Sequence, residues 1–168
     1  MSDLNSTEFE PTRHLLTSRA EYTAAFNQVL GLVRHELRIF DPDLTQLPLA
    51  SAATLNTLRD FLSRRRDNRI YIALHNPDLV ARRMPRLMSL LGIFSEKISI
   101  NQTEGDAARA QDCFVLADHH HFVRRRVWAQ ARGVLVLNDE KEAHKMRERF
   151  DEIWQSSLPA VCATSSGL

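Results

Sequence analysis

Short apolar runs alternate with helical patterns along this chain, and this alternation limits its fold more than any other feature. The runs with strand-like composition lie at residues 36–40, 69–74, 97–100, 113–117, 121–126 and 133–137. Helical spacing precedes the first run, separates the first three and follows the last. Because strands separated by such helices form right-handed βαβ units, we predict an α/β domain with a mainly parallel mixed sheet and helices on both faces. The turn after residue 117 adds one antiparallel hairpin.

Capping residues mark the starts of two predicted helices. Ser18 and Glu21 have the spacing of a capping box. Asn138 is the predicted N-cap of the last helix, and Asp139 follows it at the positive end of the helix dipole. The buried face predicted for that helix consists of Ala143, Met146, Phe150, Ile153 and Trp154.

The length of 168 residues suits a single domain. We place this domain at residues 18–156, between a flexible N-terminal segment (1–17) and a flexible C-terminal tail (157–168). The apolar runs are far shorter than a membrane span, and the polar, acidic start is unlike a targeting peptide, so we expect a cytoplasmic protein. The two cysteines, Cys113 and Cys162, predict neither a disulfide nor a zinc site.

Positive charge is concentrated in the middle of the chain. The formal net charge is only +1, but residues 55–135 carry 14 Lys and Arg against 8 Asp and Glu. Almost all of these cations are arginines, whose forked guanidinium groups suit phosphate and carboxylate. One hypothesis is therefore an anionic partner. The alternative is that runs such as 64–66 only solvate the ends of helices.

Three consecutive histidines follow Asp118 and raise the question of a metal site. In an extended strand His119 and His121 share one face, and with Asp118 they would form a partial site. Further ligands could come from His75, Asp41 or Asp43, at the ends of earlier strands. The other interpretation, which we favour, is a plain hairpin turn, since Asp and His tolerate turn geometry. We expect no bound metal and no cofactor.

The order of elements, and above all the phrase "GVLVLNDEKEAHKMRERFDEIW", resembles one repeat of the phospholipase D-like superfamily over residues 18–156, and we expect an uncharacterised bacterial domain family within it. In that family a histidine, a lysine two residues on and an aspartate five further on form the active centre, with a Gly-Ser pair and an asparagine downstream. The matching positions here are Gln111, Cys113 and Asp118, and the Gly-Ser pair falls near Arg125 and Arg126. The resemblance therefore implies a degenerate motif that lacks the nucleophile and the cation, while burial should raise the pKa of the Cys113 thiol.

The resemblance leads us to expect a non-catalytic phospholipase D-like module. Because the family's active site is built from two facing repeats and this chain has one, a homodimer is implied. We expect a residual anion-binding cleft that takes a phosphate-containing ligand or a nucleic acid, lined by Arg124, Arg126, His121 and Asp118.

Two other functions stay open. The first is a purely structural or protein-interaction domain without a small ligand. The second is a divergent metal-assisted phosphohydrolase, for which the candidate ligands are Asp41, Asp43, Asp118 and either His119 or His121.

Overall fold

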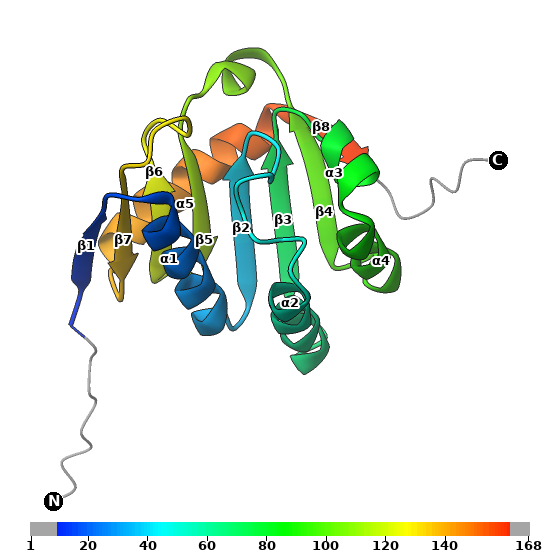
Figure 1. Ribbon diagram of the computed structural model, residues 1–168, viewed down its shortest axis with the longest axis horizontal. Helices are drawn as coiled ribbons and strands as arrows, with labels where there is room; N and C mark the ends of the chain where they lie inside the picture. The colour runs from blue at the N-terminus through cyan, green and yellow to red at the C-terminus, as the bar shows by residue number, and fades with distance from the viewer. Residues whose placement is uncertain (1–9, 162–168) are drawn as a thin grey trace, which may run out of the picture.

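A computed structural model describes residues 10–161 of the chain. In this range eight strands form one sheet in the order β1-β7-β6-β5-β2-β3-β4-β8 (Figure 1). The strands are β1 (Thr12–Leu16), β2 (Glu36–Asp41), β3 (Arg69–Leu74), β4 (Ile98–Thr103), β5 (Cys113–Ala117), β6 (His121–Arg125), β7 (Gly133–Leu137) and β8 (Ser157–Val161). The helices are α1 (Arg19–Leu32), α2 (Ala52–Arg64), α3 (Asp78–Arg83), α4 (Pro85–Ile93) and α5 (Glu140–Gln155), and a short 3₁₀ helix spans Gly105–Arg109.

The predicted mixed α/β sheet is present, but the prediction that it is mainly parallel was wrong. Among the described strands, only β2–β3 and β3–β4 pair in parallel, and the other five pairings are antiparallel. The reason lies in the connections. Helical crossovers return the chain in the same direction only between β2, β3 and β4. The turn between β5 and β6 reverses the chain, as predicted for the hairpin.

The sheet extends beyond the limits of 18 and 156 that the sequence suggested. Strand β1 pairs with β7 at one edge, and β8 pairs with β4 at the other. Both are edge strands with mostly exposed residues, so they lack the apolar pattern that reveals an interior strand. The rest of the predicted tail, including Cys162, lies outside the described residues.

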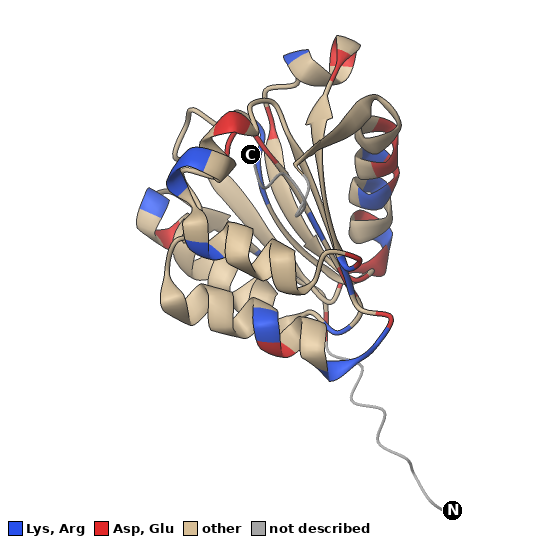
Figure 2. Cartoon of the chain, turned by 90° about the vertical axis from the view of Figure 1, so that its right-hand side faces the viewer, with Lys and Arg blue, Asp and Glu red and all other residues tan. Residues whose placement is uncertain are grey.

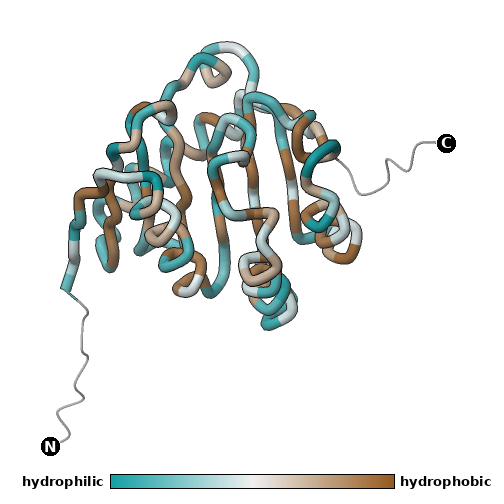
Figure 3. The backbone as a smooth tube through the Cα atoms, in the orientation of Figure 1, coloured by the Kyte–Doolittle hydropathy of each residue, from teal (hydrophilic) through white to brown (hydrophobic). Residues whose placement is uncertain are grey.

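Helices cover both faces of the sheet, as predicted. Figures 1 and 3 show α1, α2, α3 and α4 on one face and α5 on the other, with apolar segments along the central strands. The larger core cluster lies under α1, α2 and α4 and includes the fully buried Phe26, Leu37 and Leu62. The smaller one lies under α5 around Phe114 and Phe150. Within residues 10–161 there is no helix with the length and apolar character needed to span a bilayer.

Of the two predicted N-caps, the one at α1 is confirmed and the one at α5 was wrong by one residue. Ser18 Oγ accepts the Glu21 N–H at 3.1 Å, so the cap of α1 is confirmed. At α5 the N-cap is Asp139, whose Oδ1 accepts the Glu142 N–H at 3.0 Å. Asn138, which we had predicted for this role, instead has a φ of 58° and donates its N–H to His121 Nδ1. A left-handed residue is needed there because the chain turns sharply from β7 into α5.

Candidate functional site

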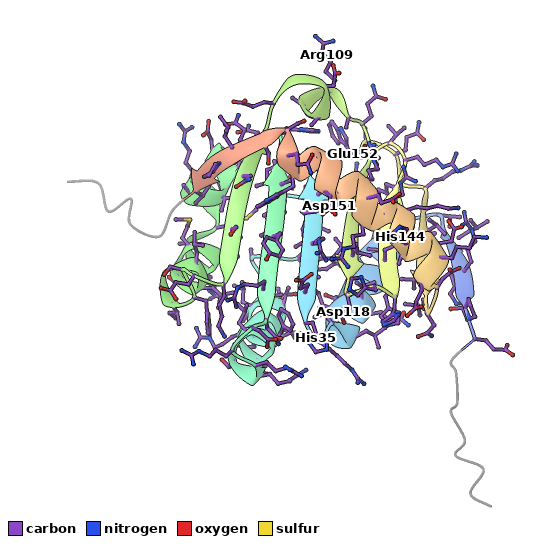
Figure 4. The ribbon with its side chains drawn as sticks, turned by 180° about the vertical axis from the view of Figure 1, so that it is seen from behind. His35, Arg109, Asp118, His144, Asp151 and Glu152 are labelled. Carbon is purple, nitrogen blue, oxygen red and sulfur yellow. The ribbon has the colours of Figure 1, made fainter. Side chains whose placement is uncertain are left out.

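The positions that match the phospholipase D motif lie at opposite ends of β5. Gln111 and Cys113 stand at its start, beside the ends of β2 and β3, which we call the carboxyl edge of the sheet. Asp118 follows its last residue, beside the start of β2, which we call the amino edge. Figure 4 shows Asp118 next to His35 at one end of the sheet and Arg109 at the other. Most of the length of β5 therefore separates Asp118 from Cys113, and all of it separates Asp118 from Gln111.

Asp118 is a structural residue at the amino edge. Its carboxylate accepts the backbone N–H groups of three consecutive residues, Arg34, His35 and Glu36, at 2.8–2.9 Å. The residue is buried and has a φ of 55°, a left-handed conformation that aspartate tolerates better than most residues. Its carboxylate therefore joins the β5–β6 turn to the segment that leads into β2.

At the carboxyl edge, a buried arginine lies beside Cys113. Cys113 and Arg125 are cross-strand partners. The Arg125 guanidinium carbon lies 3.9 Å from the centroid of the Tyr22 ring, and Nη1 donates to Gln46 Oε1 at 2.7 Å. Only 2% of Arg125 is exposed. The guanidinium of Arg125 thus packs on the Tyr22 ring, on the strand next to Cys113.

Cys113 is unsuited to nucleophilic attack. Burial, with a smaller effect from the charge of Asp41, raises the pKa of its thiol to about 12. The sulfur lies 3.7 Å from Tyr22 Oη and is surrounded by the core under α1. A thiol with this pKa holds almost no thiolate near neutral pH, in line with the sequence-based expectation.

A small polar pocket of about 100 Å³ opens at the carboxyl edge, lined by Asp41, Pro42, Asp43, Thr45, Gln46 and Trp128. Asp41 and Asp43 each order the turn after β2: Asp41 Oδ2 accepts the Leu44 N–H at 2.7 Å, and Asp43 Oδ1 accepts the Thr45 N–H at 3.0 Å. Burial raises the pKa of Asp41 to about 6 despite these hydrogen bonds. The pocket thus has two carboxylates, one of which carries a proton in mildly acidic solution.

Replacing Asp41 with asparagine is expected to stabilise the protein above pH 7. The raised pKa means that the folded state holds the proton more tightly than the unfolded state, so stability falls as pH rises from about 4 through about 6. Asparagine keeps an oxygen for the Leu44 N–H and removes the buried charge. Urea unfolding should show Asp41→Asn more stable than wild type by about 1–3 kcal/mol at pH 8 and nearly equal at pH 4. A difference that did not change with pH would contradict this.

A second buried charge cluster lies on the α5 side of the carboxyl edge. The Asp112 carboxylate accepts hydrogen bonds from Nε and Nη2 of Arg149 on α5 and from Nη2 of Arg124 on β6. Burial alone would raise the pKa of Asp112, but the Arg149 hydrogen bonds and the charges of both arginines outweigh it, and the pKa is lowered. This network joins β5, β6 and α5.

The residues proposed for an anion-binding cleft do not come together. Asp118 and His121 lie at the amino edge, where the first binds backbone N–H groups and the second accepts the Asn138 N–H at 3.0 Å. Arg124 and Arg126 lie at the other end of β6. Arg124 contacts Asp112, while Arg126 is exposed just beyond the strand. Because β6 keeps the two pairs apart, they line no common cleft.

The three histidines each have a different neighbour. His119 Nδ1 lies 2.6 Å from Arg147 Nη1, His120 Nδ1 lies 3.4 Å from Glu140, and His121 contacts the backbone of Asn138. The pKa of His119 is lowered mainly by burial and to a smaller extent by the charge of Arg147. The pKa of His121 is likewise lowered mainly by burial, with a smaller effect from His120. The segment thus forms the hairpin turn that we favoured.

The ligand set considered for a metal-assisted hydrolase is divided between the two edges. Asp41 is at the carboxyl edge and Asp118 at the amino edge, so they cannot share one ion. The two ring nitrogens of His75 lie 2.6 Å from Thr103 Oγ1 and 2.9 Å from the Ala110 carbonyl. Across residues 10–161, no three His, Cys, Asp or Glu side chains are grouped as metal ligands.

Sequence reasoning missed the roles of Tyr22, Gln46, Asp112 and Arg149. Strand alternation could have shown that Arg125 shares the inward face of β6 with Val123, because side chains alternate along a strand. No local pattern identifies Arg149 as a partner of Asp112, because the two are 37 positions apart.

Several solved structures share this fold. TrmBL2, described as an archaeal chromatin protein with a novel mode of DNA binding, is 12% identical with a TM-score of 0.65; the match covers 88% of this chain and 54%, about half, of TrmBL2. Nuc from Salmonella typhimurium, a phospholipase D family member, is 13% identical with a TM-score of 0.61, and the match covers 90% of this chain and 99% of Nuc. Phosphatidylserine synthase from Haemophilus influenzae Rd KW20 is 12% identical with a TM-score of 0.59 over 92% of this chain and 40% of the synthase.

At these identities the similarity establishes a phospholipase D-like fold and nothing about activity. No curated protein matches the sequence. The sequence itself matches a family over residues 18–162, which is most of its length. The chain therefore belongs to the family described as Domain of unknown function (DUF7931).

Proposed function

We propose that this protein is a non-catalytic phospholipase D-like module that binds an anionic partner. The observation that carries this proposal is the buried guanidinium of Arg125, packed on Tyr22 and bonded to Gln46 beside Cys113. A phosphodiester placed beside Cys113 would have to displace this guanidinium.

The groups at the motif positions support the absence of catalysis. Gln111 carries an amide, which does not form a covalent phosphoryl intermediate as a histidine does. Cys113 is a neutral thiol and supplies no positive charge to the phosphoryl oxygens. Asp118, the motif residue that is retained, binds backbone N–H groups at the far end of β5.

The excess of arginine in residues 55–135 supports an anionic partner. The shared fold of TrmBL2, described as binding DNA in a novel mode, is compatible with a binding role. A homodimer stays a prediction. It is supported by the single repeat and by the leucines exposed on the two edge strands, Leu15 on β1 and Leu158 on β8.

We expect no phosphodiester hydrolysis by the purified protein. The substrates are bis(p-nitrophenyl) phosphate and end-labelled oligonucleotides, each tested with EDTA and with Mg²⁺ or Mn²⁺. The double variant Gln111→His/Cys113→Lys should also be inactive, because Arg125 still fills the site. Turnover above the protein-free rate that disappears in Gln111→Ala or Cys113→Ala would show that the carboxyl edge is catalytic and would overturn the proposal.

A further inference from the structure

The starts of β2, β3 and β4 lie side by side at the amino edge and carry a row of cations. The Arg69 N–H donates to the His35 carbonyl at 3.1 Å, and the Ile70 N–H donates to the Lys97 carbonyl at 2.9 Å. These bonds align three neighbouring segments that carry Arg34, Arg69 and Lys97. Adjacent strands are about 4.8 Å apart, so the row spans roughly 10 Å.

The end of α2 and the turn that follows it add three more arginines, Arg64, Arg65 and Arg66, all exposed. The turn is firmly held, because Asn68 is fully buried and its Nδ2 donates to the Phe61 carbonyl at 2.8 Å. Figure 2 shows Lys and Arg, with Asp and Glu among them, at the lower end of the molecule, where α2 leads into β3. We call the six cations Arg34, Arg64, Arg65, Arg66, Arg69 and Lys97 the basic edge.

The best-held cations of the basic edge are bound by backbone carbonyls and not by carboxylates. Lys97 Nζ donates to the carbonyls of Leu62 and Arg65 at 2.6 and 3.0 Å. Arg69 Nη1 donates to the carbonyls of Arg66 and Asn68 at 3.0 and 2.9 Å. These contacts fix the side chains without cancelling their charge.

The positive charge exceeds what the local structure requires. The segments 34–36, 64–69 and 96–97, which carry the basic edge, hold the carboxylates Glu36, Asp67 and Glu96, and Glu36 pairs with Arg38 at 2.6 Å. On these segments the six cations of the basic edge therefore outnumber the two remaining carboxylates, of which Asp67 lies 3.4 Å from Arg65 Nε. The end of a helix carries only about half a negative charge, so α2 accounts for little of this surplus.

We propose that the basic edge binds the phosphate backbone of a nucleic acid, independently of base sequence. This rests on the proposed function, since it names the anionic partner and places it at the edge opposite Gln111 and Cys113. Five of the six cations are arginines, whose forks match phosphate oxygens. A line of cations along three strand starts, two of them (Arg69 and Lys97) held by backbone carbonyls, suits a linear polyanion better than the broad surface of a bilayer.

The test is a fluorescence anisotropy titration of the full chain with labelled single- and double-stranded 20-mers of mixed sequence, in EDTA, at several salt concentrations. The test variant is Arg65→Glu/Arg66→Glu. The matched control is Arg82→Glu/Arg83→Glu, which makes the same change in net charge at the exposed end of α3, after the carboxyl end of β3. Circular dichroism confirms that each variant is folded.

We expect binding that weakens with salt, and a loss of at least about tenfold in the test variant against less than about threefold in the control. The slope of log K against log salt should fall in magnitude by about 2, roughly one for each lost phosphate contact. Equal losses in the two variants would show that only net charge matters and would overturn the assignment to the basic edge.

Two further outcomes would also overturn it. Binding to phosphatidylserine-containing vesicles without binding to either oligonucleotide would show that the basic edge contacts a membrane surface. Binding to no vesicle and to no oligonucleotide would show that the six cations only keep this edge of the protein solvated. Cleavage of the oligonucleotide during the titration would instead contradict the non-catalytic function, so failures of the two proposals can be told apart.

Discussion

Replacing Asp118 with glycine is expected to destabilise the protein by about 3 kcal/mol, because three backbone N–H groups lose a charged acceptor. Glycine accepts the φ of 55° without strain, so this variant isolates the effect of the carboxylate. In Asp118→Ala the left-handed conformation should cost about 1 kcal/mol more. For a protein of this size, 3 kcal/mol lowers the Tm by about 6–12 °C.

Thermal and urea unfolding of the two variants measure these effects. Asp43→Gly is the control, since that carboxylate accepts hydrogen bonds from Thr45 within an exposed turn and should matter much less. If Asp118→Gly unfolded at the wild-type temperature, the carboxylate would not join the hairpin to β2. The aspartate at position 118 would then need a functional explanation.

The second large effect is expected for Arg149→Met, which removes the bidentate partner of Asp112. The Asp112 carboxylate is buried and would keep only the 3.3 Å contact with Arg124. Breaking a buried pair costs about 3–5 kcal/mol, and because Arg149 is itself partly exposed we expect about 2–3 kcal/mol. The control is Arg147→Met, two residues before Arg149 on α5, which should cost less than about 1 kcal/mol.

The effect of Arg149→Met should depend on pH. The pKa of Asp112 is lowered in the folded state, so its ionised form stabilises the protein above the unfolded value of 3.8, and this contribution is lost as pH falls through the lower folded value. Urea unfolding at pH 7 and at pH 3 should therefore show a larger difference between Arg149→Met and wild type at pH 7. An equal or larger difference at pH 3 would mean that Arg149 acts through packing of its stem and not through its charge.

The interior strands and the helices could be predicted because their burial leaves a periodic pattern in the sequence. Ile70, Ile72 and Val115, for example, lie in continuous apolar runs, and all three are in the core. The caps were less predictable. Asp139, and not Asn138, caps α5, since two adjacent residues of similar propensity can exchange roles when the turn before the helix needs a positive φ.

Strand direction and the edge strands were beyond local patterns. The residues of β6 would show the same pattern beside a parallel or an antiparallel neighbour. The direction of a strand relative to its neighbours depends on the connections and on pairing with distant segments. Strands β1 and β8 have mostly exposed side chains and are held in the sheet by backbone hydrogen bonds. Because every residue type except proline can form these bonds, the sequence of such a strand has no distinctive pattern.

By itself, the sequence determined the α/β class, the helices on both faces and the hairpin at the histidines. These features depend on residue type and short-range periodicity. Only the tertiary structure decided that Asp118 and Gln111 lie at opposite edges, that Arg125 packs on Tyr22 beside Cys113 and that Arg34, Arg69 and Lys97 form a row. Those relations are made by strand pairing between residues far apart in the chain, and it is distance in space that sets the strength of each contact.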